Sequence, residues 1–524
     1  MRVMTQKDAA ISQEEVISFL KNPDNYPCNP EIIEVHDTHG ALVFLAGEDA
    51  YKIKKAVKFP YMDFSTLDLR RKFCARELDI NQPAAPEIYL GVVAITQEKD
   101  GSLAFDGAGQ PVEWAVHMKR FEQKNMLDQL PHEAVTDKTL IAKLAGVVFK
   151  YHQAAKRVNV SDGPYRVKVL IDELMESFED APDIFSKKKV AQFGKLAMQH
   201  LANAHYCLRF RGRRGFIRRC HGDLHLRNIV LLDGKPVLFD ALEFDENLAT
   251  TDVLYDLAFL LMDLDQRRMS PSANQLLNRY LYLSGALDDI YGLTAMPLFL
   301  SIRAGIRAMV ANDHARQVSG KAAEKEQAAA REYFLTAHQY LKAKQPVLIA
   351  VGGFSGTGKT TLAARLSGIL EHVPGFLHLR SDLERKSLFD VPETERLAPT
   401  RYTQETSDQV YARLHHKARI ALKSGQRVIV DAVFSKESER ALFERLAEEF
   451  GIPFVGLWLE AKESLIAERV AARKNDASDA TPTVVHQQVN RGAGDINWHR
   501  IDASGTEFDS LQQALSILEL SKID

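Results

Sequence analysis

The sequence predicts a chain of two domains, a two-lobed α+β domain followed by an α/β domain built on a parallel sheet. A length of 524 residues suggests about three domains, with two or four readily possible, and makes a single core improbable. Residues 320–346 are rich in helix formers and end at Pro346, just before an apolar run. We therefore predict a helical extension over 1–30, a first domain over 31–320, a helical linker over 321–345 and a second domain over 346–524.

The composition is that of an ordinary globular protein, with 45% apolar and 26% charged residues. The 67 Lys and Arg against 70 Asp and Glu give a net charge of −3, so no overall attraction to nucleic acid or an anionic membrane is expected. The four cysteines form no Cys-x-x-Cys pair, and we find neither a signal core nor an apolar run of the ~18 residues that a membrane span needs. These features predict a cytoplasmic protein.

The first domain opens with a hairpin pattern, in which two short apolar runs surround the turn Gly47-Glu48-Asp49. Its later part is mostly helical after about residue 133, which predicts a β-rich lobe followed by a helical lobe. The predicted elements are strands over 41–45 and 50–54, a helix over 68–81, a strand over 88–95 and a strand-rich piece over 228–240.

The second domain alternates strands with helices, which predicts a parallel sheet covered by helices. Strands are predicted over 347–351, 376–379, 427–430 and 454–459, and helices from Lys359 and over 404–423 and 436–450.

The pattern G-x-x-x-x-G-K-[ST] runs from Gly353 to Thr360, between the first predicted strand of this domain and a helix. Its glycines let backbone amides turn toward phosphate oxygens, and the helix amino terminus adds positive potential. Lys359 is predicted to reach the β and γ phosphates of ATP, and Thr360 to ligate Mg²⁺. The predicted nucleotide-binding residues are Gly353, Ser355, Gly356, Thr357, Gly358, Lys359, Thr360 and Thr361.

Two aspartates follow predicted strands of the same domain. Asp382 begins a helix, where it is placed either to accept a proton from a substrate hydroxyl or only to cap the helix. Asp431 ends an apolar strand, the position of an aspartate that holds Mg²⁺, although a strand-end turn residue is the alternative.

Arg469 and Arg473 lie four residues apart on one helical face and are candidates for a lid over the transferred phosphoryl group; solvated helix arginines are the alternative. Together with the phosphate motif, these residues resemble the small P-loop kinases of the gluconate kinase, polynucleotide 5′-kinase and zeta-toxin type. The resemblance covers about 346–524 and implies a base at Asp382, a lid at the two arginines and a substrate contact at Arg385. It implies no particular acceptor.

A second constellation lies in the first domain, where Asp223, Asn228 and Asp240 follow the spacing of kinase-type phosphoryl transfer. In that chemistry one aspartate takes the acceptor proton, an asparagine five positions later binds metal, and a second aspartate after a hairpin binds Mg²⁺. We therefore predict Asp223 as catalytic and Asn228 and Asp240 as metal ligands.

The run His221-Gly222-Asp223 resembles the aminoglycoside phosphotransferase and choline kinase branch of the kinase-like fold, over about 30–315. The resemblance implies that Lys52 holds the α and β phosphates and that Glu77 is its ion-pair partner. Lys54 lies on the same strand face, so the choice between the two lysines stays open, with Lys52 favoured.

The first domain departs from the resemblance in two ways. No G-x-G-x-x-G loop precedes Ala41, and Glu243 stands three positions after Asp240, where it is at most an auxiliary ligand. Asp252 and Asp256 share one helical face and either anchor the catalytic loop or serve as helix caps or surface acids.

A basic run precedes the catalytic motif. It suits an anionic substrate or an RNA backbone, but a solvated loop is the favoured interpretation because no aromatic ladder accompanies it. The run comprises Arg209, Arg211, Arg213, Arg214, Arg218 and Arg219.

Taken as a whole, the chain resembles fused aminoglycoside phosphotransferase-like and ATP-binding proteins. The resemblance implies an ATP-dependent kinase with two Mg²⁺-ATP sites that phosphorylates hydroxyl groups of small molecules, sugars or nucleotide-like acceptors. Two alternatives stay open: one domain is an ATP-binding regulator of the other, or the second domain is a polynucleotide or nucleotide-sugar kinase.

Overall fold

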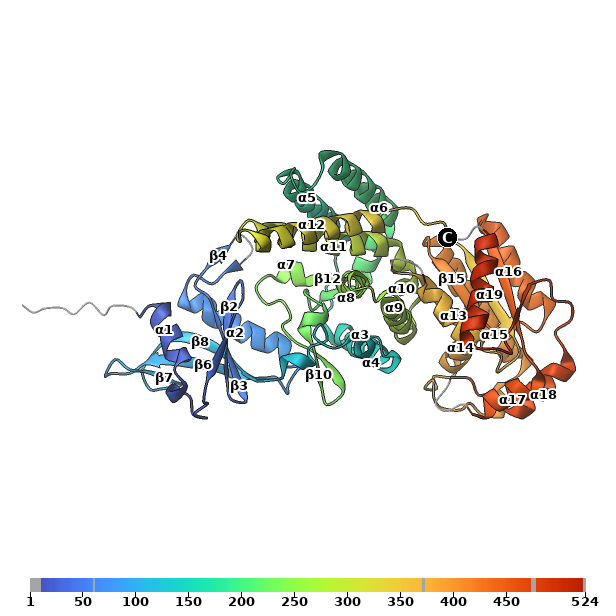
Figure 1. The fold of residues 1–524 in the computed structure, drawn as a ribbon, viewed down its shortest axis with the longest axis horizontal. Coiled ribbons are helices and arrows are strands. Elements are labelled where there is room, and N and C mark those ends of the chain that lie inside the picture. The colour runs from blue at the N-terminus through green and yellow to red at the C-terminus, as the bar shows by residue number, and fades with distance from the viewer. Residues whose placement is uncertain (1–10, 60–61, 370–372, 473–476, 522–524) are drawn as a thin grey trace, which may run out of the picture. The chain divides into compact units, whose positions relative to one another are not determined.

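The computed structural model describes residues 11–59, 62–369, 373–472 and 477–521. They form two compact units (Figure 1). The first unit runs up to Val158 and includes Ile217–Asp256, whereas Asn159–Phe216 and the residues from Leu257 onward form the second. The helices after Leu257 therefore group with the carboxy-terminal sheet; the domain limits drawn from the sequence remain predictions.

An antiparallel sheet in the order β1-β2-β3-β8-β6-β7 dominates the first unit. One of its faces buries Phe44 and Ile53 against Val16 and Leu20 of helix α1, which begins with a capping box at Ser12. The elements are α1 (Gln13–Lys21), β1 (Ile33–Asp37), β2 (Ala41–Ala46), β3 (Asp49–Lys54), β6 (Tyr89–Gln97), β7 (Leu103–Phe105) and β8 (Gln110–Lys119).

The remaining elements of the first unit include one long helix and several short strands. Helix α2 packs on strands of the large sheet, and there are two short antiparallel pairs, β9 with β12 and the hairpin of β10 with β11. Strands β9 and β10 flank residues 220–228, the segment that contains Asp223 and Asn228. They are β4 (Lys58–Phe59), β5 (Met62–Asp63), α2 (Leu67–Asn81), α3 (His132–Val135), α4 (Lys138–Ala154), β9 (Ile217–Arg219), β10 (Ile229–Leu232), β11 (Lys235–Leu238), α7 (Glu246–Ala249) and β12 (Thr250–Asp252).

The second unit contains a five-stranded parallel sheet in the order β14-β15-β13-β16-β17. Its central strand β13 is buried throughout, as continuous apolar strands of parallel sheets are. The elements are β13 (Leu348–Gly353), α13 (Lys359–Gly368), β14 (Phe376–Arg380), α14 (Ser381–Leu388), α15 (Gln404–Lys423), β15 (Arg427–Asp431), α16 (Glu437–Phe450), β16 (Phe454–Glu460), α17 (Glu463–Ala471), α18 (Pro482–Arg491), β17 (His499–Asp502) and α19 (Glu507–Leu520).

A group of helices precedes this sheet in the second unit. Helix α12 covers most of the predicted linker and packs along α11, with Phe334 and Tyr340 buried. The group comprises α5 (Gly163–Glu179), α6 (Lys187–Arg213), α9 (Ser270–Ser284), α10 (Leu287–Gly292), α11 (Met296–Ala315) and α12 (Lys321–Tyr340), and α8 (Val253–Gln266) enters it from the first unit.

The stretch Leu287–Ala315 is long and apolar enough to cross a membrane by length and composition, but 67% of its apolar window is buried inside the fold. Packing accounts for that composition. The predicted fold classes, α+β and then α/β with a parallel sheet, are confirmed.

Candidate active sites

The catalytic motif of the first unit brings its three predicted polar residues together. The Asn228 amide donates to Asp223 twice, at 2.9 Å to the backbone oxygen and 2.9 Å to Oδ2. Asn228 lies just before β10, and Asp240 follows β11, so the hairpin returns the chain to the motif. Asp240 has φ 59°, which turns the backbone sharply after the strand.

Lys52 connects this motif to the large sheet and to helix α2. Its Nζ lies 2.8 Å from Glu77 Oε1 and 2.5 Å from Asp240 Oδ1. Burial favours the neutral amine, but the charges of Asp240 and Glu77 hold the pKa of Lys52 well above its usual range. The geometry thus places Lys52, the favoured lysine, at the predicted metal-binding aspartate.

Lys54 lies deeper and has a different pair of partners. Its Nζ contacts Glu77 Oε2 and Glu243 Oε1, and its side chain is 2% exposed. Glu243, which the sequence offered only as an auxiliary metal ligand, is therefore the buried counterion of Lys54. Burial raises the pKa of Glu243, although the charge of Lys54 opposes the shift.

Asp256 anchors the backbone of the catalytic loop. Its Oδ2 accepts from the amide of His221 at 3.2 Å and its Oδ1 from the amide of Gly222 at 2.8 Å. The prediction that Asp256 holds the loop is confirmed. Asp252 accepts from the Leu254 amide at 2.9 Å, as the helix-cap alternative predicts.

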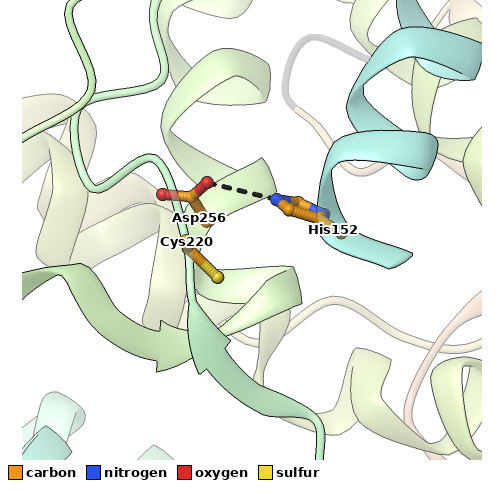
Figure 2. Close-up of side chains that lie close together, drawn as sticks. All are labelled: His152, Cys220 and Asp256. Atoms are coloured by element: carbon orange, nitrogen blue, oxygen red, sulfur yellow. Dashed lines mark hydrogen bonds and ion pairs between the residues drawn. The ribbon is translucent and has the colours of Figure 1, made fainter. Parts of the chain in front are cut away.

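A further histidine, which the sequence did not single out, completes this anchor (Figure 2). His152 Nε2 lies 3.1 Å from Asp256 Oδ2, and both side chains are fully buried. Cys220 lies beside them, and ligand atoms of the three residues are within 4.8 Å of one another. The Cys220 thiol donates to the Thr251 oxygen at 3.5 Å.

His225 is a second residue that sequence reasoning passed over, although it stands between Asp223 and Asn228 in the chain. Its Nε2 lies 3.2 Å from Asp223 Oδ2. The signal in the sequence was a polar residue, His225, two positions after the candidate base Asp223.

The phosphate motif of the second unit joins β13 to α13. Gly353, Gly356 and Gly358 have φ of 136°, 93° and 94°, values that side chains other than glycine rarely adopt. Lys359 Nζ donates to the Phe354 oxygen at 3.0 Å, and Thr361 lies in the first turn of α13.

A side-chain hydroxyl and a backbone amide of the loop donate to different partners. Thr357 donates to the Phe354 oxygen at 2.9 Å, within the loop. The amide of Ser355 donates to Gln488 Oε1 of α18 at 2.8 Å. Gln488 lies 133 positions along the chain, and no local spacing points to it.

Thr360 and Asp431 form the predicted magnesium pair. Thr360 Oγ1 donates to Asp431 Oδ2 at 2.5 Å, and His378 Nε2 lies 3.7 Å from the same oxygen. Burial acts to raise the pKa of Asp431, but the His378 contact and the charge of Lys359 hold it below its usual range. An ionised carboxylate beside a hydroxyl is a donor set that fits Mg²⁺.

Asp382 begins α14, next to these groups. Burial and the negative charge of Asp431 raise its pKa, and the charges of Lys359 and Arg380 oppose the shift. A raised pKa makes a carboxylate a better proton acceptor near neutral pH.

Arg469 contacts the end of the sheet. Its guanidinium donates to the oxygens of Ala503 at 2.8 Å and Gly505 at 3.2 Å. Helix α17, which carries Arg469, borders the phosphate loop, since a Cβ on Gly356 would lie 2.7 Å from the Ile466 oxygen. The lid role of Arg469 stays a prediction, and Arg473 lies outside the described residues.

The basic run does not form one continuous charged surface. Arg211 is buried against Asp289 at 3.0 Å, and Arg218 donates to the His152 oxygen. Arg219 donates to the oxygens of Cys220 and Leu242. Arg209, Arg213 and Arg214 are exposed, which favours the interpretation as a solvated segment.

Two family models match the chain, one in each part. The phosphotransferase enzyme family matches residues 75–292, and an AAA domain matches residues 348–493. The uncharacterized protein Rv2004c of Mycobacterium tuberculosis is 30% identical over 503 residues, which cover 94% of this chain and 97% of that protein. The chain belongs to the family of this uncharacterized protein, and it joins a part that matches the phosphotransferase enzyme family to a part that matches an AAA domain.

The adenylyl-sulfate kinase of Myxococcus xanthus is 34% identical over 118 residues, 22% of this chain and 59% of that enzyme. Among solved structures, a choline kinase from Cryptosporidium parvum shows 12% identity and a TM-score of 0.37 over 63% of this chain and 95% of its own. A gluconokinase from Sinorhizobium meliloti shows 19% identity and a TM-score of 0.26 over 34% and 96%.

Proposed function

We propose that this protein is an ATP-dependent kinase with two nucleotide sites, each transferring the γ-phosphoryl group of Mg²⁺-ATP to a hydroxyl group of a small molecule. One observation carries the proposal. In each unit a carboxylate suited to Mg²⁺ contacts a side chain of the predicted triphosphate site, Asp240 with Lys52 and Asp431 with Thr360.

In the first unit, Asp223 accepts the proton of the acceptor hydroxyl while the hydroxyl oxygen forms a bond to the γ-phosphorus. The bond between that phosphorus and the bridging oxygen breaks, and ADP leaves. Asn228 orients the Asp223 carboxylate through its 2.9 Å hydrogen bond. Lys52, kept charged by Glu77, binds the phosphates.

In the second unit, Asp382 accepts the acceptor proton and the same bonds form and break. Lys359 neutralises phosphate charge, and the loop amides bind phosphate oxygens. Asp431 and Thr360 would hold Mg²⁺ here, and Asp240 and Asn228 would hold it in the first unit. When bound, the ion neutralises charge on the triphosphate.

The proposal is tested by counting nucleotides and then assigning them. Calorimetric titration of the full chain with an ATP analogue in excess Mg²⁺ should give two equivalents. Lys359→Ala should remove one equivalent and slow its site by at least about 10² to 10³. A total below two equivalents would contradict the two-site proposal.

The regulator alternative makes a separate prediction. Single-turnover transfer from labelled ATP to a metabolite extract should be lost from one site in Asp223→Asn and from the other in Asp382→Asn. A domain that binds ATP but loses no transfer with its own aspartate is a regulator.

We also propose a cytoplasmic location, which suits four cysteines that form no disulfide, three of them buried.

A further inference from the structure

Strand β14 is an edge strand of the parallel sheet, paired with β15 on one side. In a parallel ladder, every second residue of a neighbouring strand donates to one carbonyl and accepts from the amide two residues further on. On the outer side of β14 these groups include the carbonyl of Phe376 and the amide of His378. Unpaired, such an edge invites association with other chains.

Asn278 of helix α9 takes up both groups. Its Nδ2 donates to the Phe376 oxygen at 3.0 Å, and its Oδ1 accepts from the His378 amide at 2.8 Å. One side-chain amide thus reproduces the two hydrogen bonds that a residue of a sixth strand would make.

Asn274, one helical turn earlier, extends the same contact. Its Nδ2 donates to the oxygens of Pro374 at 2.6 Å and Phe376 at 2.9 Å, and the residue is 2% exposed. The Asn278 amide also donates to Asn274 Oδ1 at 3.1 Å, so the two side chains orient each other. All of these residues belong to the second unit.

The strand held in this way leads directly to the phosphate site. The ring of His378, whose amide Asn278 binds, lies 3.7 Å from Asp431 Oδ2. The same carboxylate oxygen accepts from Thr360. A shift of β14 along or away from α9 would therefore move a direct neighbour of the predicted magnesium ligand.

We propose that Asn278 is a positioning residue of the carboxy-terminal phosphate site. Its side chain makes the hydrogen bonds that an additional strand would make to the edge of β14, and it thereby fixes the position of His378 and hence that of Asp431. The helical part of the first predicted domain thereby supplies a piece of the second site. The inference rests on the proposed function only in one part of its test, the measurement of how Mg²⁺ changes ADP affinity.

Two other contacts join the helices before the sheet to residues outside β14. A variant of such a contact can therefore distinguish weaker attachment of the helices from loss of the position of β14. Arg279 pairs with Glu393 at 2.5 Å, and Gln426 donates to the Leu293 oxygen at 3.1 Å. Neither contact involves β14. Arg279→Met is therefore a matched control, one position from Asn278, that weakens the interface and leaves the strand edge bonded.

The experiment uses the full chain with Lys52→Met to silence the amino-terminal site. Asn278→Leu, Asn278→Ala and Arg279→Met are compared for hydrogen exchange of the peptide covering β14, and for ADP affinity with and without Mg²⁺. Asn278→Ala, with its smaller side chain, serves if the leucine variant fails to fold.

Both Asn278 variants should speed exchange in β14 by about tenfold or more, since each loses two hydrogen bonds to the strand. The factor by which Mg²⁺ strengthens ADP binding should fall by a similar amount. ADP affinity without Mg²⁺ should stay within about threefold of the parent. Arg279→Met should change neither quantity.

Unchanged exchange in the Asn278 variants, or equal effects in Arg279→Met, would overturn the inference. If the parent shows no Mg²⁺-dependent ADP binding that Lys359→Ala removes, the proposed function of this site is wrong. In that case the exchange comparison alone decides whether Asn278 positions β14.

Discussion

Lys54 contacts two carboxylates inside the first unit, and one of these two partners differs from those of Lys52. Lys52 reaches Asp240, whereas Lys54 reaches Glu243, and both share Glu77. The two lysines are alternate residues of one strand, so sequence alone left them nearly equivalent. Only the position of the segment from Asp240 to Glu243 distinguishes Lys52, the predicted phosphate-site lysine, from Lys54.

Replacing Lys54 should therefore affect stability more than nucleotide binding. Lys54→Met leaves the Glu243 carboxylate buried without its cation, and we expect a loss of about 3–5 kcal/mol in the free energy of unfolding. The double variant Lys54→Met/Glu243→Gln should recover more than half of the loss. Urea titrations followed by a first-unit probe would measure both.

The loss in Lys54→Met should also depend on pH. Burial already raises the pKa of Glu243, and removing Lys54 raises it further. A folded-state pKa above the unfolded value stabilises the fold below the unfolded pKa, and this stabilisation disappears as the pH rises through the folded pKa. The Lys54→Met variant should therefore have a lower free energy of unfolding at pH 8 than at pH 5. A pH-independent loss would contradict the assigned pairing.

Asp382 gives a second prediction at this scale. Transfer needs the ionised carboxylate, so the rate at the carboxy-terminal site should fall as the pH drops through the raised pKa of Asp382. Arg380→Met removes a charge that lowers this pKa and should move the acid limb to higher pH. Single-turnover ATP hydrolysis in an Asp223→Asn background would record the shift.

Arg365→Met is the control for this experiment. It also removes one arginine charge, but that arginine forms an exposed ion pair with Glu507 and is not among the charges that shift the pKa of Asp382. Its acid limb should coincide with that of the parent. An acid limb that moves to lower pH in Arg380→Met would exclude Asp382 as the titrating base.

The conformation of the phosphate loop depends on the strand and helices around it more than on single side chains. The loop lies between β13 and α13, with α17 against it at Gly356. A Cβ on Gly356 would lie 2.7 Å from the Ile466 oxygen and 2.8 Å from Val470 Cγ2, whereas one on Gly358 meets nothing within 4 Å. Both glycines have positive φ, so their substitutions share the backbone strain and differ in the contact with α17.

Gly356→Ala should therefore cost more than Gly358→Ala. Backbone strain should cost each variant about 1–3 kcal/mol, and Gly356→Ala should additionally displace α17 and lower ADP affinity by a further tenfold or so. Thermal unfolding and ADP titration of both variants would measure the difference. Equal losses would mean that α17 does not restrain the loop.

Several elements and site residues could be predicted because their signals are local. The phosphate motif, Asp431 at a strand end and the spacing of Asp223 and Asn228 each fall within a few residues of chain. His152, Gln488 and Asn278 could not be predicted, since they meet their partners at separations of 104, 133 and 100 residues. Such contacts depend on how elements pack, which periodicity does not report.

At the scale of the whole molecule, the helices between Leu257 and residue 346 belong to the unit that carries the parallel sheet. The alanine-rich stretch read as a linker forms α12, whose apolar side packs on α11. Alanine-rich helices suit both a spacer and a close-packed layer, so composition alone did not separate the two uses.

A fragment of residues 346–524 should therefore be less stable than one of residues 257–524, which retains α9. Removing α9 takes away the partners of Pro374, Phe376 and His378, several hydrogen bonds worth about 0.5–1.5 kcal/mol each. The shorter fragment should also self-associate through its exposed strand edge. Denaturant titrations and sedimentation of both fragments would show this, and equal stability would contradict it.

The contact between Ser355 and Gln488 bears on how an anion enters the loop. The amide that would meet a phosphate oxygen already donates to a carboxamide, so arrival of the anion is an exchange of acceptors at one N–H. The released carboxamide belongs to α18, so we expect occupancy of the loop to affect a helix more than a hundred residues downstream. A fluorophore on α18 would report loading without touching the phosphate.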